Sequence, residues 1–316
     1  VQTEKFLEGH DRDRTAISVF GQENNDRTWR MAKMNLAIHG LNANLGTIWG
    51  DTFARDQHPD VQMDYVLANP PFNIKDWARN DRDGRWRYGV PPVNNANYAW
   101  LQHIIHPLAP GGSAGVVLAN GSMSTNTGGE GAIRAQIVDA DLVSCMVALP
   151  TQLFRSTGIP VCLWFFALDK GPSAGRVAGE ERAGVSRPLA DRRGQVLFID
   201  ARELGFMQDR AHRAFTDADI ARIADTYHAW RGTTSARDKG LEYADQPGFC
   251  ASATLKQVAD AGYALTPGRY VGAPEVVVDA AEVRERIDRL TWELLEQLDE
   301  SERLAQVVRE QLGRVR

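Results

Sequence analysis

The sequence is poor in several features that would assign it to a special class. It has only three cysteines in 316 residues, Cys145, Cys162 and Cys250, and their spacing fits no metal site. A disulfide scaffold is thereby excluded, and a reducing cytoplasm is favoured. The longest apolar run, 161–168, has the length of a strand and not of a membrane span. The net charge of −5 excludes binding to nucleic acid through overall charge, so any such contact needs a local basic patch or a partner.

The chain does have a hydrophobic content of 43%, arranged as short apolar runs that alternate with amphipathic segments. This pattern predicts one large α/β domain with appended segments. Strands are expected over 17–23, 47–53, 65–68, 113–119, 142–149, 161–169 and 195–200, and helices over 1–10, 28–39, 97–108, 133–140 and 216–230. Met31 and Met34 are expected to pack into the core from their helix.

The sequence suggests three parts. Residues 1–201 form the α/β domain, in which 171–194 is interpreted as a flexible surface insertion, and residues 202–275 form a small α/irregular region. Residues 276–316 carry a long charged helix with an apolar stripe of mixed three- and four-residue spacing. The stripe consists of Val283, Ile287, Leu290, Leu294, Leu298, Leu304, Val308 and Leu312. A helical partner is expected on it, and the alternative is a helix folded back onto the body.

The most informative stretch is Asn69-Pro70-Pro71-Phe72, which ends the apolar run 65–68. Prolines cannot continue a sheet ladder, so the strand must stop in a stiff turn at the edge where open α/β sheets bind ligands. The Asn69 side-chain oxygen and the Pro70 carbonyl are then two fixed acceptors, which localise the lone pair of a weakly nucleophilic amine without an ionised base. Phe72 offers a stacking face to a flipped base. The alternative is a plain strand-ending turn with a buried Phe.

Two acidic residues are expected at neighbouring strand ends. Glu23, followed by Asn24, is placed where an acid accepts hydrogen bonds from ribose hydroxyls in nucleoside-binding folds. Asp51, followed by Thr52, is placed where it accepts from an adenine amino group. Taken singly, each acid is explained as well by a solvated strand end or a turn. Together with Asn69 they form a stronger signal for a ligand site.

The connection 73–98 is long and polar, as functional loops often are. Its arginines and aromatics suit contact with nucleic acid, and a solvated loop with anchoring aromatics is the alternative. The residues concerned are Arg79, Arg82, Arg85, Arg87, Trp77, Trp86 and Tyr88.

At this point the sequence resembles the M subunit of type I restriction-modification systems. The resemblance is carried by residues 20–40, 50–60, 68–73, 88–100, 108–121, 147–154 and 265–272. It implies a Rossmann-like class I methyltransferase sheet, with S-adenosylmethionine as cofactor. It also implies methyl transfer to the N6 amine of a flipped adenine in double-stranded DNA. The implied partners are a specificity subunit docked on the C-terminal helix, a second M subunit and, often, a restriction subunit.

The resemblance also implies roles for individual residues. Catalytic roles at the target base fall on Asn69, Pro70, Pro71 and Phe72, and cofactor contacts fall on Glu23, Asn24, Asp51, Thr52 and Asn69. Two rival interpretations remain open. One is a non-catalytic remnant that acts only as an interaction subunit. The other is a protein-glutamine N5-methyltransferase, which shares the Asn-Pro-Pro turn, although Phe72 and the long C-terminal helix count against it.

One departure from the family pattern concerns the N-terminal residues. Members of the family carry a strand that ends in an Asp-Pro-x-x-Gly-x-Gly-type loop before the first helix of this region, and residues 1–20 hold no such segment. We therefore expect a sheet that lacks its first, central strand, in an N-terminally truncated M subunit. We also expect the chain alone to bind S-adenosylmethionine poorly.

Overall fold

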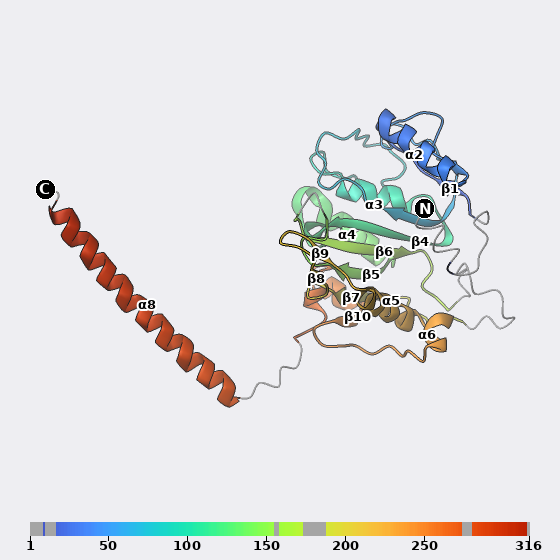
Figure 1. Ribbon diagram of the computed structural model, residues 1–316. Coiled ribbons are helices and arrows are strands. Elements are labelled where there is room, and N and C mark those ends of the chain that lie inside the picture. The colour runs from blue at the N-terminus through green and yellow to red at the C-terminus, as the bar shows by residue number, and fades with distance from the viewer. Residues whose placement is uncertain (1–8, 10–16, 155–157, 173–187, 274–279, 315–316) are drawn as a thin grey trace. The chain divides into compact units, whose positions relative to one another are not determined.

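The computed structural model describes residue 9 and residues 17–154, 158–172, 188–273 and 280–314 (Figure 1). The helix expected over 1–10 and most of the insertion expected over 171–194 lie outside these residues. The chain divides into two compact units, Val1–Ala273 and Pro274–Arg316, and each is described by itself.

The first unit is built on a six-stranded mixed sheet with the strand order β10-β7-β5-β6-β4-β3. Its strands are β3 (Met63–Ala68), β4 (Leu108–Ala119), β5 (Val143–Ala148), β6 (Val161–Ala167), β7 (Gln195–Asp200) and β10 (Cys250–Thr254). β3 runs parallel to β4 and β5 parallel to β7, whereas β6 and β10 are antiparallel to their neighbours. This mixed α/β sheet confirms the expected fold class.

Helices cover both faces of this sheet. On one face, α3 (Asn97–Ile105), α4 (Glu130–Asp139) and α7 (Leu255–Asp260) pack in a core that includes Trp164. On the other face, α5 (Asp217–Arg231) inserts Trp230 among the buried side chains. The short helix α6 (Thr234–Asp238) follows α5. Cys145, Cys162 and Cys250 are buried free thiols.

No boundary is found at residue 201, where the sequence suggested one. β10 pairs with β7 along Cys250–Thr254, so residues beyond 201 complete the sheet. β10 is rich in small side chains (Cys-Ala-Ser-Ala-Thr), which give a weak strand pattern. The sequence analysis therefore did not predict this strand. A short hairpin of β8 (Phe206–Met207) and β9 (Arg213–Ala214) precedes α5.

The N-terminal part of the first unit departs most from expectation. β1 (Val19–Phe20) and β2 (Ala43–Asn44) form a separate two-stranded parallel sheet, joined by α2 (Asp26–Ile38). The strand expected over 47–53 is absent, because the Gln57 side chain takes the place of a ladder partner. Its Oε1 accepts from the Thr47 N–H (3.0 Å) and its Nε2 donates to the Ile48 carbonyl (2.8 Å).

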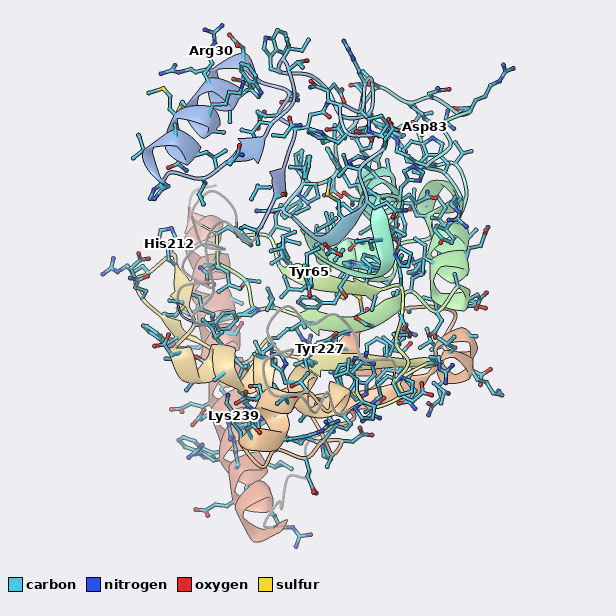
Figure 2. The ribbon with its side chains drawn as sticks, turned by 90° about the vertical axis from the view of Figure 1, so that its right-hand side faces the viewer. Arg30, Tyr65, Asp83, His212, Tyr227 and Lys239 are labelled. Atoms are coloured by element: carbon cyan, nitrogen blue, oxygen red, sulfur yellow. The ribbon has the colours of Figure 1, made fainter. Side chains whose placement is uncertain are left out.

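The helix α2 also differs from its sequence interpretation. No residue of α2 is buried, and Met31 and Met34 are 60% and 64% exposed, so their expected core packing is wrong. In Figure 2, α2 (Arg30) and the connection after β3 (Asp83) lie at the top, away from α6 (Lys239).

β3 forms the edge of the six-stranded sheet, and no described strand pairs with its outer side. Val66 and Ala68 pack against the core, while Tyr65 and Leu67, on the opposite face, are 54% and 79% exposed. The described residues therefore cover only one face of β3, although the apolar run 65–68 is typical of a strand buried on both faces. Within the described residues, no strand connects the separate β1–β2 sheet to β3 by hydrogen bonds.

The second unit holds α8 (Ala280–Arg314), which confirms the long C-terminal helix. Its apolar side chains Ile287, Leu290, Leu294, Leu298, Leu304 and Val308 are exposed. Among the described helices, none combines the length and apolar composition that crossing a bilayer requires.

Candidate active site

A cavity of about 590 Å³ opens between the end of β1, the segment after β2 and the carboxyl end of β3. The sequence-predicted site residues that line it are Glu23, Asn24, Asp51, Thr52, Asn69, Pro70 and Pro71. Phe72 is not among the lining residues. The structure therefore brings these positions together, although Glu23 and Asp51 do not end strands of the same sheet as Asn69.

Gln22, which the sequence analysis did not single out, joins the two acidic segments. Its Nε2 donates to the carbonyls of Gly50 (3.0 Å) and Arg55 (2.8 Å), and its Oε1 accepts from the Gln57 N–H (3.1 Å). The Gly50 N–H also donates to the Glu23 carbonyl (2.8 Å). Residues 22–23 and 50–57 therefore form one hydrogen-bonded block. The only sequence signal for this role was the position of Gln22 beside Glu23.

The two carboxylates of this block each hold a local turn. One Glu23 oxygen accepts from the Asn25 N–H (2.9 Å), and Asp51 Oδ1 accepts from the Phe53 N–H (2.7 Å). Each is a short side-chain-to-backbone turn of the kind that fixes a carboxylate's direction. No hydrogen bond within the described residues uses Asp51 Oδ2, so that oxygen remains an acceptor for a ligand.

The Asn69-Pro70-Pro71-Phe72 turn ends β3, as its prolines require. Asn69 is exposed and Pro70 is buried. Phe72 is partly buried and packs against the core on both faces of the sheet, as the alternative interpretation of the turn described. The residue that follows the turn, Asn73, is hydrogen-bonded to α3.

Asn73 has a left-handed backbone (φ 54°), and the Asn97 side chain clamps it. The Asn73 N–H donates to Asn97 Oδ1 (2.9 Å), and Asn97 Nδ2 donates to Asn73 Oδ1 (2.9 Å). Nearby, the Ala96 N–H donates to the Ile74 carbonyl (3.0 Å). Asn97 is 2% exposed, so the clamp is shielded from water on one side.

The connection after the turn is anchored by its aromatics. Trp77 and Trp86 are buried against Phe53, and each indole N–H donates to a carbonyl of the same connection. The anchoring alternative is therefore correct for both tryptophans, and Trp77 also lines the cavity. Arg82 and Arg87 are exposed.

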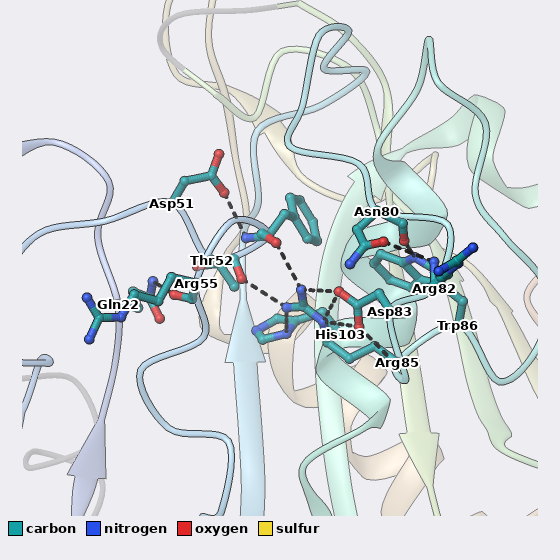
Figure 3. A network of polar contacts seen from close by, with 11 residues as sticks. Gln22, Asp51, Thr52, Arg55, Asn80, Arg82, Asp83, Arg85, Trp86 and His103 are labelled. Atoms are coloured by element: carbon teal, nitrogen blue, oxygen red, sulfur yellow. Dashed lines mark hydrogen bonds and ion pairs between the residues drawn. The ribbon is translucent and has the colours of Figure 1, made fainter.

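Arg85 is buried beside the Asp51 segment, where it faces Asp83 and His103 (Figure 3). Hydrogen bonds from the Arg85 guanidinium hold the pKa of Asp83 below its usual range. Burial, aided by the Arg85 charge, lowers the pKa of His103 to about 4. His103 is therefore neutral at physiological pH.

Fold and cavity together define an α/β protein with a candidate ligand site at the carboxyl end of a parallel strand. Residues 1–278 match the N-6 DNA methylase family, and the chain belongs to that family.

The relatives are methylase subunits of type I restriction enzymes. The chain is 45% identical over 315 residues to the HindI methylase subunit of Haemophilus influenzae. This match covers 99% of the chain and 65% of the relative. It is 35% identical to the MjaIX methylase subunit of Methanocaldococcus jannaschii, over 96% of this chain and 51% of the relative.

A solved structure of a type I restriction-modification methyltransferase subunit from Streptococcus thermophilus superimposes with a TM-score of 0.66 at 25% identity. The match covers 84% of this chain and 51% of that one. The chain thus spans about half to two thirds of the length of the relatives it matches.

Proposed function

We propose that this chain carries the active site of a site-specific DNA adenine-N6 methyltransferase, the modification subunit of a type I restriction-modification system. The observation that carries the proposal is the single cavity that gathers Glu23, Asp51 and the Asn69-Pro70 turn. Family membership supports the reaction class, and the residue types support the chemistry.

The residues of the cavity fit the nucleoside half of S-adenosylmethionine. Its volume lies within the roughly 300–1,000 Å³ of small-molecule sites. Glu23 supplies acceptors for ribose hydroxyls, with Asn24 beside it, and Asp51 and Thr52 lie where an adenine amine is received. Among the residues that the structure describes, the lining contains no glycine-rich loop for the methionine half. The expectation that the chain alone binds the cofactor poorly therefore stays a prediction.

The target amine is activated by acceptors and not by a base. The Asn69 side-chain oxygen and the Pro70 carbonyl accept the two N6 hydrogens, which leaves the nitrogen lone pair free to attack. The cofactor, when bound, supplies an electrophilic methyl group. Pro71, which lines the cavity, forms part of the wall against which a flipped adenine rests, and stacking on Phe72 stays a prediction because that side chain lies outside the lining.

DNA and protein partners follow from the same proposal. Arg82 and Arg87 offer exposed positive charge on the connection beyond the turn, while the net charge of −5 leaves most phosphate contacts to a specificity subunit. That subunit docks on the apolar stripe of α8, and a second M subunit and a restriction subunit complete the assembly. The buried free thiols suit the cytoplasm.

The test replaces Asn69 by alanine in a complete methylase subunit that contains this sequence, assembled with its specificity subunit. Transfer of labelled methyl groups to duplex DNA is expected to fall by about 100-fold or more, the usual cost of losing one aligned polar group in an active site. Asn94→Ala, which replaces an exposed asparagine in the connection 73–98 after the turn, is the matched control. Nucleoside analysis identifies N6-methyladenine as the product.

Normal methylation by the Asn69→Ala enzyme would refute the role of the turn. Methylated glutamine in a protein, with no methylated DNA, would favour the protein-glutamine methyltransferase. No methyl transfer by the wild-type complex would favour the non-catalytic interaction subunit.

A further inference from the structure

Arg85 lies outside the cavity lining, yet it bonds directly to the segment that carries Asp51. Its Nη1 donates to the Thr52 carbonyl (2.9 Å) and its Nη2 to the Phe53 carbonyl (3.2 Å). These are the two residues that follow Asp51, and they lie more than 30 residues from Arg85 in the chain. Figure 3 shows the Arg85 guanidinium between Thr52 and Asp83.

All three nitrogens of the Arg85 guanidinium form hydrogen bonds within this network. Its Nε donates to Asp83 Oδ1 (2.9 Å) and its Nη2 to Asp83 Oδ2 (2.6 Å). Its Nη1 also lies 3.1 Å from His103 Nδ1. Because Arg only donates, Nδ1 of His103 must accept, and the ring proton lies on Nε2. The network thus links the connection, α3 and the Asp51 segment through one side chain.

The shape of the group explains why an arginine serves here. Two carbonyls, a carboxylate and an imidazole nitrogen surround it, and only a planar fork with five donors reaches all four. A lysine would keep the charge and lose the fork. The Arg85 side chain is 8% exposed and that of Asp83 is 14% exposed, so water does not easily replace the missing donors.

We infer that Arg85 is a positioning residue that fixes the Asp51-Thr52-Phe53 turn and thereby aims the Asp51 carboxylate into the cavity. Fixing two successive carbonyls sets the peptide planes on either side of Phe53. The Phe53 N–H is the donor that holds Asp51 Oδ1 (2.7 Å). The direction of the free Asp51 oxygen therefore depends on Arg85. The assignment of adenine to Asp51 rests on the proposed function, whereas the fixing of the turn does not.

The first experiment measures amide hydrogen exchange in the 316-residue chain without any ligand. Arg85→Met is expected to speed exchange at residues 51–57 by at least about 10-fold, because buried acceptors lose their donor. Arg87→Met, which removes an exposed arginine two residues away, is the matched control and leaves these amides unchanged. Unchanged exchange in Arg85→Met, or an equal increase in Arg87→Met, overturns the inference.

Arg85→Lys serves as a second variant should Arg85→Met fail to fold. It retains a positive charge beside Asp83 but cannot reach both carbonyls. Exchange at residues 51–57 is expected to rise by at least about 10-fold here too, and protection equal to wild type overturns the inference.

The second experiment uses the complete methylase subunit and separates cofactor binding from chemistry. Arg85→Lys is expected to raise the KM for S-adenosylmethionine about 10-fold, with kcat at saturating cofactor changed less than about threefold. In an Asp51→Ala background the same substitution is expected to add no further loss, because both act through one carboxylate. An unchanged KM, or fully additive losses, overturns the positioning role. A wild-type subunit that methylates no DNA defeats the proposed function instead, and the exchange result still decides whether Arg85 fixes the turn.

Discussion

The clamp between Asn73 and Asn97 offers a direct test of how the Asn-Pro-Pro turn is held. Asn97→Ala removes two hydrogen bonds of 2.9 Å from a residue that is 2% exposed. Each such bond contributes about 1 kcal/mol. Asn73 is itself exposed, so water re-solvates its freed groups and the loss of the clamp lowers the free energy of unfolding by about 2 kcal/mol.

The effect on catalysis is expected to exceed the effect on folding. Asn73 has φ 54°, a left-handed conformation whose cost of about 1 kcal/mol or less for asparagine is offset by the hydrogen bonds of the clamp. Without the clamp the exit of the turn relaxes, and the Asn69 and Pro70 acceptors move out of alignment. We expect kcat for DNA methylation to fall at least about 10-fold, with the KM for S-adenosylmethionine nearly unchanged.

The assay combines urea unfolding of the chain with methyl-transfer kinetics of the complete subunit. Asn94→Ala, in the same connection and exposed, should change neither. A normal kcat in a destabilised Asn97→Ala protein would show that the turn holds its shape by its prolines alone, and would refute the reasoning.

Two further predictions follow from the partly buried His103 and from α8. His103 has a pKa of about 4 in the fold against an ordinary 6.5, so the unfolded chain binds its proton more readily. The stability due to neutral His103 is complete above about pH 6.5 and is lost as pH falls towards 4, by up to about 3 kcal/mol. The urea concentration at the unfolding midpoint should depend less on pH across this range in His103→Asn than in wild type. In His106→Asn, which replaces an exposed histidine and serves as the control, the dependence should remain. On α8, Leu290 and Leu294 are exposed, and replacing both by Glu should weaken binding to the specificity subunit at least 10-fold in a pull-down titration, since each leucine that becomes buried in the complex contributes about 2 kcal/mol. Unchanged binding would exclude the stripe as the interface.

The sequence by itself determined the elements whose residues carry a local physical constraint. Pro70 and Pro71 end β3 because they lack an amide hydrogen, and the apolar runs before and after them form strands of the sheet. The last helix follows from its own charge pattern and its three- and four-residue spacing. The grouping of Glu23, Asp51 and Asn69 was also predicted, and the cavity contains all three.

Only the tertiary structure decided how that grouping is achieved. The sequence predicted strand ends, but the strand at 47–53 does not form, because the side chain of Gln57 satisfies the backbone there. Local patterns also cannot show that Arg85 is buried under the Asp51 segment while Arg87 is exposed, since both lie in the same polar connection. Such roles depend on contacts between residues far apart in the chain. The geometry of the site is therefore set by long-range hydrogen bonds, which no periodicity encodes.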